Sequence, residues 1–231
     1  MGGCTNCSSP NGAGGCGNRK VGEADLLAEI LHEVYPSHAW GQPDDAAWYG
    51  RGVPETTVRR IAMRAAADLK APTRFVAGDE DETSDSVEIL CVGRSPGVLE
   101  LAAQPGAIDL PDGEHLEERY LRAVFSHMAP VAVVQEVIAT MDRQDDTWVI
   151  ASHARPGVFD PILLKRTQKL VDLIVEEGVH FLDYGLVEKA PMGFDGAEYK
   201  DVWGVDPGIV QYLFSPRPAG LRHTLVRPCS P

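Results

Sequence analysis

The sequence predicts an α+β fold: a mostly antiparallel sheet covered by helices on one side, with an irregular cysteine-rich loop at the N-terminus. Three observations lead to this fold class. Segments with helical and with strand-like apolar spacing occur in the order two helices, three strands, helix, two strands, helix, three strands. Turn residues separate most of the strands, which favours antiparallel pairing. No internal repeat is visible, and we expect the chain to divide into a cysteine-rich segment at residues 1–20, whose chemistry is argued below, and one α+β domain at 21–231.

The composition is that of a globular protein with an acidic surface. Of its 231 residues, 44% are hydrophobic and 24% are charged, so the chain can bury a substantial core. The net charge is −13 and lysine and arginine form no cluster, which argues against nucleic-acid and anionic membrane surfaces. No run of about 18 apolar residues occurs, and the first twenty residues lack the apolar stretch of a secretory signal. We therefore expect a cytoplasmic protein without membrane insertion, whose thiols do not form disulfides.

Two helices are predicted in the first seventy residues. The first runs from about Glu23 to Tyr35, and a proline follows it directly. The second begins at Pro54, a residue favoured at the first position of a helix, and continues to about Lys70. Their apolar stripes consist of Leu26, Leu27, Ile30, Leu31 and Val34 in the first helix, and of Val58, Ile61, Ala62, Ala65, Ala66 and Leu69 in the second.

Two connecting segments differ from the rest in composition. Residues 37–50 are rich in aromatic residues, glycine and proline, and His38, Trp40 and Trp48 either anchor this loop to the core or frame a partner surface. Residues 78–85 are acidic and lie between two predicted strands. Their spacing does not match a calcium-binding loop, so we interpret them as a solvated hairpin tip.

The remaining domain is predicted to contain two more helices and eight strands. The third helix runs from about Glu114 to Met128. The fourth is capped by Asp160, begins at Pro161 and ends at Gly178. The predicted strands cover residues 73–77, 87–92, 98–102, 131–141, 147–152, 179–185, 209–214 and 221–226. The first three are expected to form a meander, and the next two a hairpin.

The chemistry is predicted to lie near the N-terminus, where three of the five cysteines occur within the first sixteen residues. Cys4, Cys7 and Cys16 form a C-x2-C-x8-C pattern. The residues between them have no apolar surface to bury, so the hydrophobic effect cannot order this segment, whereas a bound ion or cluster can. The intervening glycines allow backbone N–H groups to point at bound thiolates. A redox-active C-x-x-C pair fits less well, because it should follow a strand and open a helix. An inert glycine-rich tail is the third interpretation.

A fourth ligand must come from elsewhere. Three local cysteines and one remote cysteine are typical of iron–sulfur clusters, whereas zinc sites more often use two local pairs. Cys91 lies in a predicted strand and is expected to pack in the core, while Cys229 lies in an irregular tail. We therefore expect Cys4, Cys7, Cys16 and Cys229 to bind an iron–sulfur cluster, with 4Fe–4S favoured and zinc as the alternative. A histidine, a residue of a partner chain or an open iron position are the other options for the fourth position.

The expected function is electron transfer, as a redox or accessory subunit of a larger redox complex. The acidic surface favours a basic protein partner, and we expect a redox enzyme subunit. One alternative is a zinc-stabilised protein-interaction module with the same cysteines. The other is an α+β enzyme with incidental cysteines, in which His153, or His180 with Asp183, acts in acid–base chemistry. No G-x-G-x-x-G follows a strand, and neither H-E-x-x-H nor G-x-S-x-G occurs, so we assign no catalytic residue.

Overall fold

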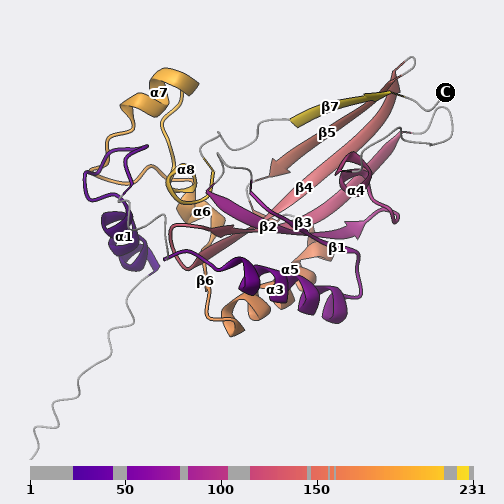
Figure 1. Ribbon diagram of the computed structural model, residues 1–231, viewed down its shortest axis with the longest axis horizontal. Helices are drawn as coiled ribbons and strands as arrows, with labels where there is room; N and C mark the ends of the chain where they lie inside the picture. Colours follow the sequence, from indigo (N-terminus) through magenta and orange to yellow (C-terminus); the bar gives the residue numbers. More distant parts are fainter. Residues whose placement is uncertain are drawn as a thin grey trace, which may run out of the picture.

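The computed structural model describes residues 23–43, 51–78, 83–103, 115–144, 147–155, 157–158, 160–215 and 223–228. Within these ranges the chain forms a seven-stranded, mostly antiparallel sheet with helices packed on it (Figure 1). The predicted α+β class is confirmed. Helices cover both faces, however, so the expectation of helices on one side is wrong. The cysteine-rich loop lies outside the described residues, and the division of the chain near residue 20 stays a prediction.

The sheet is arranged around β4, the longest of the described strands. The strand order is β1-β2-β3-β4-β5-β7, with antiparallel pairing throughout, and the short β6 pairs in parallel with β4. The strands are β1 (Thr73–Val76), β2 (Ser84–Val92), β3 (Leu116–Ser126), β4 (Val131–Gln144), β5 (Thr147–Arg155), β6 (His180–Phe181) and β7 (His223–Pro228). Strands β1 to β5 therefore lie side by side in chain order, and the connection from β2 to β3 contains α4.

Helices α3 (Glu55–Leu69) and α5 (Pro161–Glu176) cover one face of the sheet. Their apolar sides pack on the inward residues of β2, β3 and β4, and burying each large side chain contributes about 1.5–3 kcal/mol. Ion pairs also join the middle of α3 to the C-terminal end of α5, where Arg64 lies 2.5 Å from Glu176 and 2.9 Å from Glu177. The core on this face includes Val58, Ile61, Ala65, Val87, Ile89, Leu121, Phe125, Leu163, Leu170 and Ile174.

The opposite face is covered by different helices at its two ends. At one end, α4 (Val98–Ala103) packs on β2, β3 and β4. At the other end, α1 (Glu23–Val34), α6 (Tyr184–Val187) and α8 (Ile209–Leu213) pack on the start of β4, and α7 (Ala197–Trp203) lies beside this group in Figure 1. The two cores share no residue, so the face has a break between them.

Strand β3 replaces a predicted helix. The apolar spacing predicts a helix over residues 114–128, but the structure has a strand at Leu116–Ser126. Tyr120 and Leu121 are neighbours that a helix would place on the same side, whereas in β3 they point to opposite faces of the sheet, and both are buried. A strand that is covered on both faces loses the polar alternation by which it is recognised.

Helix α8 replaces a predicted strand because tertiary contacts stabilise it. Four consecutive carbonyl groups at its end accept hydrogen bonds from distant side chains. The donors are Trp40 Nε1 to Gln211 at 3.2 Å, Tyr35 Oη to Tyr212 at 2.6 Å, Ser126 Oγ to Leu213 at 2.6 Å and Ser84 Oγ to Phe214 at 2.5 Å. These bonds satisfy carbonyls that have no partner inside so short a helix. Residues 98–102, also predicted as a strand, form most of α4 for a related reason given below.

The other predicted elements are present, with some bounds changed. Helices α1, α3 and α5 and strands β1, β2, β4, β5 and β7 agree with the sequence to within three residues at each end. Only two residues of the predicted strand 179–185 pair with the sheet, and α7 occupies part of a predicted loop. Strands β1 and β2 pair antiparallel, as a hairpin requires, although residues 79–82 of the acidic tip lie outside the described residues.

Candidate functional site

A row of four polar side chains crosses the face of the sheet that α4 covers. The register places Arg74 of β1 opposite Glu88 of β2, Glu88 opposite Arg122 of β3, and Arg122 opposite Gln135 of β4. Because side chains alternate between the faces of a sheet, all four residues point the same way. The row lies where the two apolar cores on this face do not meet.

Glu88 holds both arginines of the row. Its side chain is 3% exposed. Its Oε1 accepts hydrogen bonds from Arg122 Nε at 2.8 Å and Nη2 at 2.5 Å, and its Oε2 accepts from Arg74 Nε at 3.1 Å and from Arg74 Nη2. Burial acts to raise the pKa of the Glu88 carboxyl, but the two guanidinium groups outweigh burial and hold the pKa below its ordinary value of 4.5. Glu88 is therefore ionised, and the three charges sum to +1.

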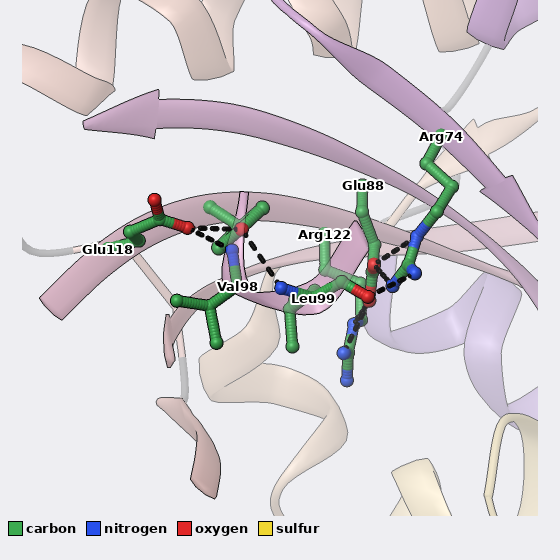
Figure 2. A network of polar contacts seen from close by, with 7 residues as sticks. Arg74, Glu88, Val98, Leu99, Glu118 and Arg122 are labelled. Carbon is green, nitrogen blue, oxygen red and sulfur yellow. Dashed lines mark hydrogen bonds and ion pairs between the residues drawn. The ribbon is translucent and has the colours of Figure 1, made fainter. Parts of the chain in front are cut away.

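Arg74 also links the row to α4. Its Nη1 donates a hydrogen bond to the carbonyl of Leu99 at 2.5 Å, as Figure 2 shows. Together with the two bonds to Glu88, this uses three of the five N–H donors of its guanidinium, and the described residues supply no partner for the other two. The guanidinium is thus held in one orientation before any ligand arrives.

Glu118 holds the start of α4 in place. It lies at the opposite side of the polar network from Arg74 in Figure 2. Its Oε1 accepts a hydrogen bond from the backbone N–H of Arg94 at 3.2 Å, and its Oε2 accepts from the N–H of Val98 and from Tyr120 Oη at 2.6 Å. The Tyr120 oxygen in turn accepts from the N–H of Leu99 at 3.2 Å. Burial and then the bond to Glu118 raise the pKa of Tyr120, so the phenol stays protonated and can donate. This buried carboxylate explains why residues 98–103 are helical rather than paired in the sheet.

Two glycines allow the chain to pass this close to Glu118. A Cβ atom at Gly93 would lie 2.7 Å from Glu118 Cγ, and Gly93 also has a φ of +139°. At Gly97 a Cβ atom would lie 2.3 Å from Tyr120 Oη. Any larger residue at either position would push α4 away from the sheet.

A cavity of about 270 Å³ lies between the polar row and α4. Its lining includes Arg74, Glu88, Leu90, Ser95, Glu100 and Tyr120. The buried Glu88, Leu90 and Tyr120 form the floor, whereas Ser95 and Glu100 are exposed and lie at the mouth. Fixed charges of both signs beside the apolar side chain of Leu90 and the ring of Tyr120 are suited to binding a small polar molecule.

A second polar cluster occurs on the opposite face, where the N-terminus of α5 meets β3 and β4. The Glu136 side chain is fully buried, and neither carboxylate oxygen has a hydrogen-bond partner among the described residues. Arg119 Nη1 lies 3.7 Å from Glu136 Oε1 and 2.8 Å from Asp160 Oδ2. Asp160 also caps α5 by accepting from the N–H of Ile162 at 2.7 Å, as predicted. Arg119 therefore joins this helix to the sheet.

The predicted ligands Cys4, Cys7, Cys16 and Cys229 lie outside the described residues, so their arrangement stays a prediction. Cys91 is described and is a free, half-buried thiol at the end of β2. Its Sγ lies 3.4 Å from the Ile89 carbonyl oxygen, and burial raises the pKa of the thiol. This agrees with the expected packing role. In the described part of the chain, no group of three or more histidine, cysteine, aspartate or glutamate residues could hold a metal ion.

The candidate acid–base residues are not brought together. His153 lies on β5, and its buried Nδ1 has no hydrogen-bond partner among the described residues. His180 and Asp183 are both exposed, and no hydrogen bond joins them within the described chain. Asp183 instead caps α6, accepting from the N–H of Gly185 at 2.8 Å.

Trp40 anchors its loop to α8 and is half-buried, as one of the two interpretations predicts. Trp48 lies outside the described residues. The sequence carries one signal of the polar row: Glu88 is the one charged residue of the run 87–92, and Arg122 is the one charged residue of the run 120–125. Only the register shows that they face each other.

Among the described residues, no helix is both long enough and apolar enough to cross a membrane. No family model, no curated protein and no solved structure matches this chain, so its function must be argued from its own residues.

Proposed function

We propose that this chain is an iron–sulfur protein, with a 4Fe–4S cluster favoured, and that it acts as an electron-transfer or accessory subunit of a larger cytoplasmic redox complex. The observation that carries the proposal is the C-x2-C-x8-C pattern of Cys4, Cys7 and Cys16 in a segment without large apolar side chains. Thiolates are the usual ligands of such clusters, and this segment has no other means of becoming ordered.

The surroundings of the two remaining cysteines favour Cys229 as the fourth ligand. Metals bind the thiolate rather than the thiol, and burial raises the pKa of Cys91. Arg166 donates a hydrogen bond to the Cys91 carbonyl at 3.2 Å, which ties this residue further into the fold. Cys229 directly follows β7, the last strand at one edge of the sheet.

The proposed partner is a basic protein, most simply another subunit of a redox enzyme. A net charge of −13 slows the approach of acidic proteins and speeds that of basic ones. Complementary charge of this kind is a common basis of short-lived electron-transfer complexes, whose interfaces are small.

The test is metal analysis of the full chain purified without oxygen. We expect a brown protein that holds about four iron and four sulfide per chain and whose visible absorption bleaches on reduction. Cys16→Ser should lose the colour. Cys91→Ser is the matched control, because it also removes one thiol, and it should keep the colour.

Three results would contradict the proposal. A colourless protein with one zinc ion per chain would identify the zinc-stabilised interaction module instead. A chain purified free of metal would show that the cysteines bind no cluster. Full cluster occupancy in Cys16→Ser would show that Cys16 is not a ligand of the cluster.

A further inference from the structure

The cavity beside the polar row contains a guanidinium with unused binding capacity. Arg74 and Arg122 share the single carboxylate of Glu88, so this group of three has one positive charge in excess. The Arg74 and Arg122 side chains are only 29% and 23% exposed, where water screens the excess charge less than at an open surface. Arg74 keeps two free N–H donors among the described residues. The planar fork of an arginine fits a carboxylate well.

The Glu100 carboxylate lies at the mouth of the same cavity. Glu100 lies on the exposed side of α4 and lines the cavity. Within the described residues it forms no ion pair, so Arg74 does not already neutralise it. The carbonyl of the preceding residue, Leu99, is hydrogen-bonded to Arg74, which places the two opposite charges at neighbouring points of one wall.

The charges around the cavity select the class of ligand. Of the lining residues, Arg74 is positive and Glu88 and Glu100 are negative, and Arg122, which does not line the cavity, is paired with Glu88. These four charges sum to zero, so a ligand with no net charge is favoured over a simple anion. It should present its own charges separately, a carboxylate toward the guanidinium and an ammonium toward the mouth. Glu118 adds little to this balance, because Figure 2 places it at the far end of the network from Arg74, where two backbone N–H groups and the Tyr120 hydroxyl satisfy it.

The size and floor of the cavity restrict the ligand further. Its volume of about 270 Å³ is just below the range of about 300–1,000 Å³ typical of pockets for drug-sized molecules. The floor offers the apolar side chain of Leu90 and the ring of Tyr120, which lie opposite each other on β2 and β3. A short aliphatic group fits this surface.

We infer that the cavity binds a small zwitterion of the α-amino acid class, with its carboxylate on Arg74, its ammonium on Glu100 and an aliphatic side chain against Leu90. This site is independent of the cysteines. Because Arg74 is already held by Glu88 and Leu99, little side-chain freedom is lost when the ligand binds.

The test is calorimetric titration of the full chain with L-leucine, N-acetyl-L-leucine and L-leucinamide. The acetyl derivative lacks the ammonium and the amide lacks the carboxylate. We expect L-leucine to bind at least about tenfold more tightly than either derivative, a difference of about 1.4 kcal/mol. Equal affinity for all three, or no heat of binding with L-leucine, would overturn the inference.

Variants assign the two charges separately. Arg74→Gln should weaken L-leucine binding by about tenfold or more, and it leaves the pair of Glu88 and Arg122 intact. Glu100→Gln should weaken L-leucine but leave N-acetyl-L-leucine unchanged, since only the first ligand carries an ammonium. Arg59→Gln is the matched control, because Arg59 lies over the Phe75 ring on the other face of β1, and it should bind like the wild type.

A second measurement keeps the inference testable if Arg74→Gln does not fold. Glu100→Lys changes an exposed residue, and it should abolish L-leucine binding while keeping the melting temperature of the wild type. Unchanged binding in Glu100→Lys would contradict the assigned orientation. Cys16→Ser should bind L-leucine normally, so failure of the cluster proposal and failure of this one are distinguishable.

Discussion

Glu88 is the single side chain on which the polar row depends, since it contacts both arginines. Glu88→Gln leaves two guanidinium groups facing each other without a counter-charge. We expect it to lower the free energy of unfolding by about 2–3 kcal/mol at pH 7, less than for a fully buried pair because the arginines are partly exposed. Urea denaturation measures this difference. Glu100→Gln, which removes an exposed carboxylate beside the same cavity, should change the stability by less than about 0.5 kcal/mol.

The effect of Glu88→Gln on the free energy of unfolding should depend on pH. The pKa of Glu88 is lower in the folded protein than its ordinary value of 4.5, so its contribution is fully present above about pH 4.5 and is lost as the pH falls through the folded pKa. The difference in stability between wild type and Glu88→Gln should be constant from pH 7 to about pH 5 and shrink below about pH 4.5. If the difference in stability between wild type and Glu88→Gln instead grows as the pH falls, the arginines do not hold the Glu88 carboxyl ionised.

Glu136 and Arg119 on the opposite face should respond in opposite directions. Glu136→Gln removes a buried charge that no hydrogen bond satisfies, and Arg119 keeps its contact with Asp160, so we expect a change between zero and about 1 kcal/mol of stabilisation. Arg119→Leu leaves Glu136 buried and unpaired and should cost about 3 kcal/mol or more. Thermal melts of Glu136→Gln, of Arg119→Leu and of the double variant measure the coupling between the two residues. Equal losses of stability in the two single variants would contradict this prediction.

Helix α8 shows how side chains far away in the sequence can determine an element. Its end carbonyls accept from Tyr35 of the segment after α1, from Ser84 of β2 and from Ser126 of β3. Ser126→Ala would leave the buried Leu213 carbonyl without its donor, and we expect a loss of about 1–3 kcal/mol. Thr147→Ala is the matched control, because this hydroxyl donates at an exposed turn, to Gln144 at 2.9 Å, and its loss should cost less than about 0.5 kcal/mol. Amide exchange should quicken in α8 only in the Ser126 variant.

The spacing of apolar residues was enough to predict the elements that expose one side to water. Helices α3 and α5 show a polar and an apolar side, and the proline and aspartate at the start of α5 mark its first turn. β3 was misread because it is buried on both faces, and α4 and α8 because a carboxylate and a set of hydroxyls from other elements hold them. The cavity site could not be predicted either. Arg74, Glu88 and Arg122 come from three strands, and only the register of the sheet brings them together.

The described residues form three apolar cores, which lead to a prediction about the entire fold. Among the described residues, the members of these cores lie between Leu27 and Phe214. Metal binding near the N-terminus should therefore not be the source of folding free energy, in contrast to a zinc finger, which unfolds without its metal. A full chain with Cys4→Ser, Cys7→Ser and Cys16→Ser should keep its far-ultraviolet circular dichroism and melt within about 2–4 °C of the wild type, the shift that about 1 kcal/mol produces in a protein of this size. A much larger loss would mean that these cysteines stabilise the α+β domain itself rather than a separate segment attached to it.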